Sequence, residues 1–285
     1  MRIATRPLGV VLVVALVTFV ALPASAQFLY SGGSFSPTLY SLNPASGATV
    51  DSVTVVAAGY LIQQVKGLAA EPTTGELYAI LRGVAPGEGG GGQFFLATIR
   101  PDTGEATVIG DLGDAFAGLA FDGTGTLYGV TGDGAFGPEI LYTINTSDAT
   151  VSGVMNLGNG TDGEAIAFNS GDGLMYHLSG WASPPEGGLG DVVFEKIDLG
   201  TMAITDIPLS GDFFINGNGL AYDAAQGDFV VALLNDVPVE GIQVAEFARI
   251  SAAGEVSISG PLDEYAGGMA FSDFVPVELM SFSVE

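Results

Sequence analysis

One short phrase occurs five times in this sequence. It reads Gly-Leu-Ala, then an aromatic residue, then an acidic one, with variations in each copy. The copies begin at Gly67, Gly118, Ala165, Gly219 and Gly268, so successive copies are 51, 47, 54 and 49 residues apart. A fixed period of this size is typical of repeat folds, in which each repeat supplies one supersecondary unit. The chain is therefore expected to fold into about five similar units.

Three further patterns follow the phrase inside each unit. A turn containing Gly leads into a short apolar strand, as in Gly125-Thr126-Leu127-Tyr128. A strand of alternating apolar and polar residues comes next, as in Leu141-Tyr142-Thr143-Ile144-Asn145, and a fourth strand follows, as in Ala106-Thr107-Val108-Ile109. A period of two predicts a half-buried strand. Each unit therefore contains four strands, and the 43 Gly and 14 Pro residues of the chain suit its frequent reversals.

Repeated four-stranded units of 40–50 residues are typical of β-propellers. We predict an all-β fold, a single five-bladed β-propeller over residues 27–274. The chain enters this region on a second strand, Phe28-Leu29-Tyr30, and leaves it on a first strand, residues 268–272. The C-terminal strand is thus expected to close the first blade, which removes edges that invite aggregation. A parallel β-solenoid is the alternative, although its turns would be shorter than the alternating long and short connections of this chain.

The N-terminus has the order of a secretory leader. Arg2 and Arg6 precede an apolar run over residues 8–22, and Ala24-Ser25-Ala26 supplies the small residues of a cleavage site. We predict a signal peptide over residues 1–26 and a secreted protein, located outside the cell, at its surface or in the periplasm. The apolar run is shorter than the roughly 20 residues of a spanning helix, so no integral membrane segment is expected after cleavage.

The charge of the chain is one-sided, with 32 Asp and Glu residues against seven Lys and Arg and a net charge of −25. Such a surface repels nucleic acid and anionic lipid, so we expect no nucleic-acid partner. Two interpretations stay open, solubility in a salty environment and capture of divalent cations. The absence of Cys excludes disulfides and thiolate metal sites.

The connections of a propeller fall at two ends of the ring. Those between second and third strands, and those leading into the next blade, share one end, which we call the loop end; the short turns share the turn end. The loop end carries long, irregular segments, residues 83–92, 131–139, 179–191 and 235–244. Binding residues tend to lie in such loops, so we expect the ligand at this end, the alternative being tolerated insertions. Trp181, the only Trp, is expected to stack on a sugar or a protein partner, or else to pack on the blade.

The connections that lead into the first strands are acidic and rich in amides. Ca²⁺ binds several oxygen ligands that converge from different segments. We therefore predict a Ca²⁺ site at the loop end of the channel; the alternative is that the acidic surface simply continues there. The predicted metal ligands are Asp162, Glu164, Asp212 and Asn218, with Asn216 and Asn218 as ligand-binding residues. His177, the only His, lacks a second His or a Cys for a transition-metal cluster and is interpreted as structural.

Three segments resemble parts of known protein families. Residues 99–122 and 127–130 resemble secreted bacterial propellers of uncharacterised function, which implies the fold and export. Asn218-Gly219-Leu220-Ala221 resembles the gluconolactonase/regucalcin-like propellers, in which an Asn before Gly-Leu-Ala and a Glu help to hold a channel metal; Glu164 occupies the equivalent place one repeat earlier. The other repeats have Lys66, Ala117 and Gly267 there. The predicted tail, residues 275–285, resembles the segment that introduces a sorting region in exported proteins, or is an ordinary terminal strand.

Together these features favour a secreted or surface-displayed, non-enzymatic binding module, a monomer whose ligand is a glycan or a protein. The alternative is a Ca²⁺-dependent, lactonase-like hydrolase that uses Glu164 and Asn218 at the channel mouth. The sequence contains no Gly-x-Ser-x-Gly elbow, and the glycines of residues 89–92 lack the Lys-Ser/Thr of a phosphate loop.

Overall fold

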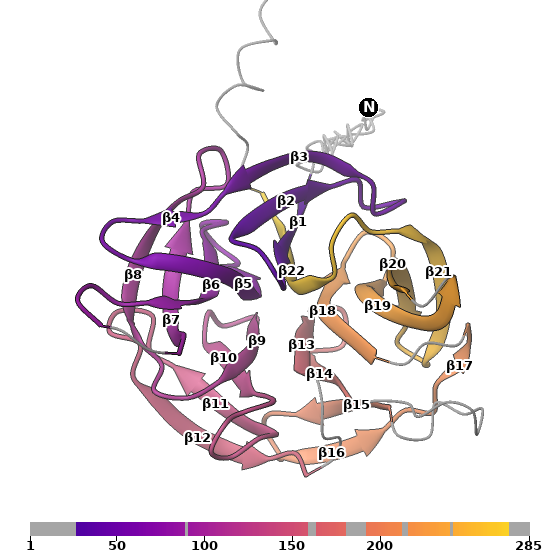
Figure 1. The fold of residues 1–285 in the computed structure, drawn as a ribbon. Helices are drawn as coiled ribbons and strands as arrows, with labels where there is room; N and C mark the ends of the chain where they lie inside the picture. The colour runs from indigo at the N-terminus through magenta and orange to yellow at the C-terminus, as the bar shows by residue number, and fades with distance from the viewer. Residues whose placement is uncertain are drawn as a thin grey trace, which may run out of the picture.

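The fold is a ring of five β-sheets around a central axis (Figure 1). A computed structural model describes residues 27–88, 91–158, 164–180, 192–212, 216–239 and 242–273. Every regular element within these ranges is a β-strand. In the same ranges there is no helix with the length and apolarity needed to cross a membrane. The chain is thus a five-bladed β-propeller, as predicted, while the predicted signal peptide and the predicted tail lie outside the described residues.

Each blade contains four antiparallel strands, which follow one another from the axis outwards. Blade 1 contains β22 (Ala266–Ser272), β1 (Phe28–Gly33), β2 (Thr38–Leu42) and β3 (Thr49–Thr54). Blade 2 contains β5 (Leu61–Ala70), β6 (Leu77–Val84), β7 (Gln93–Ile99) and β8 (Glu105–Asp111). Blade 3 contains β9 (Phe116–Phe121), β10 (Leu127–Thr131), β11 (Ile140–Ile144) and β12 (Val151–Asn156). Blade 4 contains β13 (Glu164–Asn169), β14 (Leu174–Ser179), β15 (Val193–Asp198) and β16 (Ala203–Asp206). Blade 5 contains β18 (Asn216–Asp223), β19 (Asp228–Val239), β20 (Ile242–Ser251) and β21 (Glu255–Pro261).

The ring closes within blade 1, where the last described strand joins the first. β22 pairs with β1 in a register that runs from Phe28 opposite Ser272 to Gly33 opposite Ala266. This is the closure that the sequence predicts. It gives β22 two neighbours in the ring of inner strands as well, because β22 lies between β18 and β5 around the axis (Figure 1).

Two very short parallel strands were not predicted. β4 (Val56–Ala57) pairs with the outer strand β8, and β17 (Ser210–Gly211) pairs with the outer strand β21. Each lies in the connection that leads from one blade into the inner strand of the next, so this connection first runs beside the outer edge of the blade it is about to enter (Figure 1). β4 and β17 therefore cover the outer edges of blades 2 and 5 and tie them to blades 1 and 4.

The second and third residues of the phrase form the interfaces between blades. Successive side chains of a strand point to opposite faces, so one residue packs against the preceding blade and the other against the following blade. Each of the five core clusters contains the Ala of one blade and the Leu, Ile or Met of the next. The pairs are Ala270 with Leu68, Ala69 with Leu119, Ala120 with Ile166, Ala167 with Leu220 and Ala221 with Met269. A small residue facing a large one at every interface lets neighbouring blades interdigitate near the axis.

The Gly of the phrase lies where the inner strands come closest. A Cβ atom on Gly268 would be 2.4 Å from the backbone N of Leu68 and 2.6 Å from the Cα of Gly67. A Cβ on Gly67 would in turn be 2.9 Å from the carbonyl O of Ala117 in blade 3. These contacts are with backbone atoms of neighbouring strands, which have no rotamer to change. Glycine is required at these positions by close approach, and not by its φ angle.

The acidic residue of the phrase caps the turn that follows. In blade 2, Glu71 Oε2 accepts hydrogen bonds from Thr73 Oγ1 at 2.7 Å and from the backbone N of Thr74 at 2.6 Å. In blade 3, Asp122 Oδ1 accepts from the backbone N of Thr124 at 2.8 Å and of Thr126 at 2.9 Å. Short acceptors that bond to the backbone a few residues onward are a common means of fixing turns.

An arginine links the last blade to the first. Arg249 of β20 donates from Nε to Asp228 Oδ2 at 2.8 Å and from Nη1 to the carbonyl O of Pro44, in a blade 1 turn, at 2.9 Å. Its Nη2 donates to Asp223 Oδ2 as well. These bonds, first of all those with Asp228, raise the pKa of the guanidinium above its ordinary value. The charged cluster joins three strands of blade 5 to the turn between β2 and β3 of blade 1.

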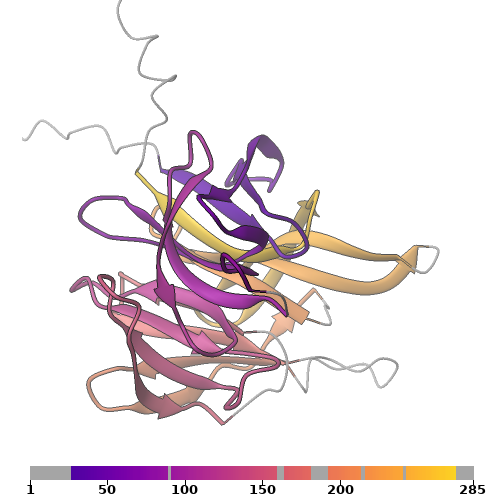
Figure 2. The same ribbon diagram turned by 60° about the vertical axis from the view of Figure 1, so that its left-hand side comes forward.

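One predicted loop is an extended hairpin instead. The sequence predicts an irregular loop over residues 235–244, but β19 and β20 continue through this segment, with Asn235 opposite Val244 and Val239 opposite Ile242. Figure 2 shows that this hairpin extends beyond the neighbouring blades. The prediction was wrong because a bulge between Asn235 and Val239 breaks the alternation by which the strands were recognised.

Substituting Gly268 with Ala tests the close packing around the axis. We expect the variant to lower the free energy of unfolding by about 2–3 kcal/mol, because the added Cβ overpacks backbone that cannot move alone. Gly91→Ala is the matched control, since a Cβ there would have no atom within 4 Å. Urea denaturation of both variants measures the difference. Equal midpoints for Gly268→Ala and Gly91→Ala would contradict the account.

Candidate functional site

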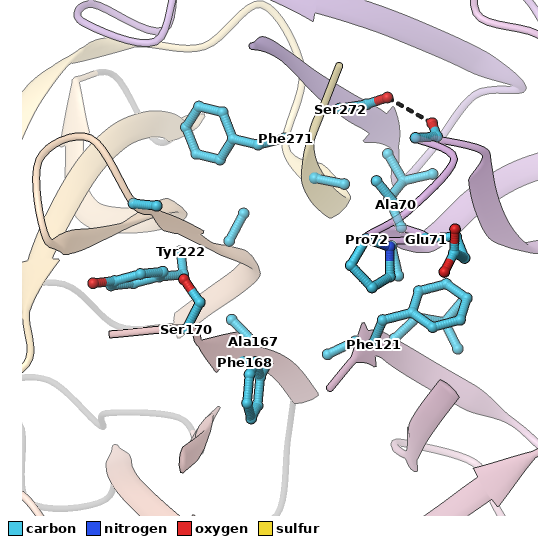
Figure 3. A pocket seen from close by; sticks show the side chains of 18 of the residues that line it. Ala70, Glu71, Pro72, Phe121, Ala167, Phe168, Ser170, Tyr222, Phe271 and Ser272 are labelled. Atoms are coloured by element: carbon cyan, nitrogen blue, oxygen red, sulfur yellow. Dashed lines mark hydrogen bonds between the residues drawn. The ribbon is translucent and has the colours of Figure 1, made fainter. Parts of the chain in front are cut away.

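At the turn end the inner strands surround a cavity of about 340 Å³, which we call the cup (Figure 3). Its walls come from every blade, because the second, third and fourth residues of all five phrase copies line it. The second and third residues contribute the aliphatic inner wall. The fourth residues lie nearest the opening, since the inner strands end there. The cup is therefore built by the same repeated residues that build the ring.

Four aromatic residues occur among those that line the cup near its opening. The fourth phrase residues are Ala70, Phe121, Phe168, Tyr222 and Phe271. Figure 3 shows the four rings spread around the cavity, with Pro72 beside Ala70 in the remaining sector. Two of these rings pack against neighbouring residues. The centroid of the Phe121 ring is 5.3 Å from that of Tyr78. The Phe168 ring lies close to Gly123, because a Cβ on this glycine would be 3.4 Å from the ring.

The formal charges on the cup lining are all negative. The charged residues that line it are Glu71, Asp122 and Asp273, and no Lys, Arg or His occurs among the described lining residues. The Thr73 hydroxyl that donates to Glu71 lowers the pKa of this carboxyl from its usual value. Glu71 therefore stays ionised at neutral pH, and the opening of the cup keeps a negative potential.

The channel is narrow beyond the inner end of the cup. Beyond it the described residues leave a cavity of only about 10 Å³, lined by the phrase glycines Gly67, Gly118, Gly219 and Gly268 together with Asn218. A space of this size holds about one water molecule. The glycine contacts that bring the inner strands together thus also narrow the channel beyond the cup.

The two predicted ligand-binding amides lie on the innermost strand of blade 5. Asn218 borders the narrow part of the channel and is 7% exposed, and its Oδ1 accepts from the backbone N of Gly219 at 2.8 Å. Asn216 is 6% exposed and its Oδ1 accepts from the hydroxyl of Tyr265. Both side chains are buried and hydrogen-bonded within the fold, so neither lies in the cup.

The predicted metal ligands are not brought together where the structure describes them. Asp212 lies at the outer edge of blade 5, where its Oδ2 accepts from the backbone N of Ile258 in β21 at 2.8 Å, whereas Asn218 lies at the axis. Glu164 begins β13 opposite Ser179, and its side chain is outside the described part of the chain. Asp162 and Trp181 also lie outside the described residues. Within the described ranges no three His, Asp or Glu residues are arranged to hold a metal, and the Ca²⁺ site stays a prediction.

Two exposed phenylalanines mark the loop end. Phe35 is 74% exposed and Phe136 is 98% exposed. The backbone N of Phe35 donates to Glu264 Oε1 at 2.7 Å, and that of Phe136 donates to Asp114 Oδ1 at 3.0 Å. In both blades the carboxylate comes from the connection into the inner strand. It fixes the loop that carries the Phe, so these loops are held in place at this end of the ring.

His177 belongs to a buried polar cluster between blades 3 and 4. Its side chain is fully buried, with Nδ1 3.0 Å from Glu195 Oε1 and Nε2 3.3 Å from Glu139 Oε2. Ser179 Oγ donates to Glu139 Oε1 at 2.9 Å. The ring thus lies between the two carboxylates, with Nδ1 at hydrogen-bonding distance from Glu195. The cluster is closed to solvent and ties the loop before β11 to β14 and β15, in keeping with a structural role for His177.

Comparisons with known proteins support the fold. No protein-family model matches the sequence, and no curated protein matches it. Among solved structures, a chain in the crystal structure of a nidogen/laminin complex is similar, with a TM-score of 0.53 and 11% identity over 87% of this chain and 98% of that one. TolB from Acinetobacter baumannii gives a TM-score of 0.48 and 13% identity over 87% of this chain and 67% of that chain. At 11% identity the likeness to the first of these shows the fold alone.

Replacing His177 with Leu tests the role of the buried cluster. We expect the free energy of unfolding to fall by about 3 kcal/mol, because Glu139 and Glu195 then remain buried without the ring between them. Ser179→Ala, which removes one hydrogen bond to Glu139, is the control and should cost about 1 kcal/mol. Thermal and urea unfolding give both values. A His177→Leu protein as stable as the unmodified chain would show that the cluster contributes nothing.

Proposed function

We propose that the protein is a secreted or surface-displayed, non-enzymatic binding module whose ligand enters the cup at the turn end. The single observation that carries this proposal is the convergence of all five repeats on one cavity whose lining is more apolar than polar. Apolar surface that stays open to water gains free energy when a ligand covers it, at roughly 25 cal/mol per Å². A concave apolar site with a few polar groups at its opening is typical of ligand pockets.

The lining of the cup supports binding and not catalysis. Its described polar residues are Gln27, Glu71, Thr73, Thr74, Asp122, Ser170, Tyr222, Ser272 and Asp273. Nucleophilic catalysis needs a nucleophile beside a base that is oriented by a third group. Two of the carboxylates accept the turn hydrogen bonds described above, and Ser272 Oγ donates to the carbonyl O of Gly75 at 2.7 Å. Glu71, Asp122 and Ser272 are thus engaged in hydrogen bonds with neighbouring turns.

Export is proposed from the sequence of residues 1–26, which has the order of a signal peptide. The ligand is a glycan or a protein that presents an apolar group to the cup. The nidogen/laminin complex is a precedent for a similar ring that occurs in a protein complex. The expectation that the protein is a monomer belongs to the same proposal.

The Ca²⁺-dependent hydrolase is the less favoured function. It requires the predicted ligands to share one site, and Asp212 and Asn218 lie at opposite edges of blade 5, one at the periphery and one at the axis. Asn218 itself is engaged with the backbone of its own strand.

Filling the cup tests the proposal. Ala70→Phe adds a ring at the one fourth-phrase position that lacks it, and the other four blades show that the fold accepts an aromatic residue there. We expect the variant to bind the neutral apolar dye 1-N-phenylnaphthylamine at least tenfold more weakly than the unmodified protein, with an unchanged melting temperature. Dye fluorescence and circular dichroism measure the two quantities.

Val50→Phe is the control for this experiment, because Val50 is 71% exposed on the outer strand of blade 1 and an added ring there leaves the cup open. Its dye affinity should match that of the unmodified protein. Equal affinities for all three proteins would place the dye outside the cup and remove the basis of the proposal.

A further inference from the structure

We propose that the loop end of the ring is a second interaction surface, which binds a basic amphipathic segment of another protein. This surface and the cup lie at opposite ends of the ring, so the inference goes beyond the proposed function. Three features carry it together: exposed apolar side chains on three neighbouring blades, loops that hold two of them in place, and the carboxylates around them.

The exposed apolar side chains come from blades 1, 2 and 3. Phe35 is 74% exposed, Leu61 is 65% exposed and Phe136 is 98% exposed. The two Phe residues lie in the connections between second and third strands, and Leu61 begins β5 opposite Val84, at the end of β6. All three therefore lie at the loop end. Blade 2 lies between the other two blades, because β5 contacts both β22 and β9.

The two phenylalanine loops share one construction. Phe35-Ser36-Pro37 and Phe136-Gly137-Pro138 each place a Pro two residues after the aromatic ring. In each loop the backbone N of the Phe donates to a carboxylate of the connection into the inner strand of the same blade, Glu264 or Asp114. A Pro fixes its own φ and restricts the residue before it. Single exposed apolar residues are common on protein surfaces, but one device that presents a Phe in two blades points to a shared role.

The Phe136 loop is anchored on both sides of the ring. Glu139 has a φ of 59°, which is uncommon and strained for a residue with a side chain. Its Oε1 accepts from Ser179 Oγ in blade 4 at 2.9 Å, and its backbone N donates to the carbonyl O of Thr131 at 3.0 Å. Thr131 Oγ1 donates to the carbonyl O of Gly137 at 2.7 Å. The backbone around Phe136 is thus fixed while its side chain stays in water.

A fixed, exposed aromatic ring is suited to bind a protein. Apolar surface gains free energy when a partner covers it, and a loop that is already ordered loses little conformational entropy on binding. Buried aromatic anchors carry much of the binding energy at protein interfaces. The loop end therefore fits a partner with apolar side chains.

The charges around the rings favour a basic partner. Exposed carboxylates lie in the connections of the same three blades at this end, at Glu88, Asp111, Asp133 and Asp263. Arg82, near the end of β6, is half-buried, and its Nη1 donates to Gln64 Oε1 at 3.4 Å. With a net charge of −25 on the chain, Lys and Arg side chains next to the apolar groups of a partner are attracted to this surface.

Two synthetic peptides test the charge of the partner. They share one amphipathic pattern of Leu residues, with Lys at the polar positions of one peptide and Glu at those of the other. Both are titrated calorimetrically into the full mature chain at neutral pH. We expect the Lys peptide to bind at least tenfold more tightly, because both peptides offer the same apolar contacts and only Lys complements the carboxylates. Equal affinities, or tighter binding of the Glu peptide, would overturn the proposal.

Phe136→Ser locates the Lys peptide at the loop end. We expect it to bind this variant about tenfold more weakly, because the variant lacks the exposed anchor, while the melting temperature stays unchanged. Val50→Ser is the matched control, since Val50 is 71% exposed on the outer strand of blade 1, and it should leave the affinity as it is. A Lys peptide that binds Phe136→Ser as tightly as the unmodified protein responds to net charge alone, which would refute the surface.

Two variants of Asp114 test how the ring is held. Both remove the same charge, but Asp114→Asn keeps an Oδ1 acceptor for the backbone N of Phe136 and Asp114→Ala does not. We expect Asp114→Ala to bind the Lys peptide about threefold more weakly than Asp114→Asn, because a released loop must be ordered on binding. Equal affinities of the two variants would contradict the preorganised loop.

Vesicles of phosphatidylcholine separate a protein partner from a membrane. Binding to these vesicles that depends on Phe136, with no binding of the Lys peptide, would overturn the proposal in favour of a lipid surface. The dye experiment on the cup is independent of this surface, since Phe136→Ser should leave the dye affinity unchanged. Failure at one end of the ring therefore leaves the proposal for the other end standing.

Discussion

The close approach of five inner strands to one axis determines the rest of this structure. At Gly268 and Gly67 the backbones of neighbouring blades leave no space for a Cβ. Next to these glycines, each interface between two blades contains one large and one small side chain. This requirement accounts for the Leu-Ala pair that follows the Gly. The same approach narrows the channel to the size of one water. At the turn end, four of the five inner strands have an aromatic residue at the fourth phrase position, and the cup lies between the ends of the five strands.

The repeat made the fold predictable from the sequence. Five copies of one phrase, in a repeat region that opens on a second strand and closes on a first strand, predict the pairing that β22 makes with β1. Local patterns also located the turns, because acceptors such as Asp122 bond to residues only two to four positions onward. Each of these features depends on residues that are close together in the sequence, so a local pattern is enough to predict it.

Other features depend on partners far apart in the chain, and the sequence does not reveal them. β4 has only two residues. It forms because it pairs with the outer edge of β8, which lies about 50 residues later in the chain. The surroundings of His177 come from Glu139 and Glu195, each in a different element, and no local spacing links the three. The cup was missed for another reason. Its aromatic residues were recognised as part of the repeat. They line one cavity only because the ring brings the ends of the five inner strands together, and the sequence does not show this arrangement. The long, irregular connections therefore pointed to the loop end as the place of function.

The most direct test of the account is a disulfide across the closing pair of strands. The chain has no Cys, so Phe28→Cys with Ser272→Cys, which lie opposite each other in β1 and β22, introduces a single pair. Registered residues of an antiparallel pair lie within the Cα separation that a disulfide spans. Mild oxidation of the folded protein, followed by proteolysis and mass spectrometry, measures the linked peptide. The account predicts near-complete intramolecular linkage of 28 to 272 and none for a control pair, Phe28→Cys with Val151→Cys in blade 3. Free thiols at 28 and 272 in the folded protein would contradict a ring closed by its C-terminal strand.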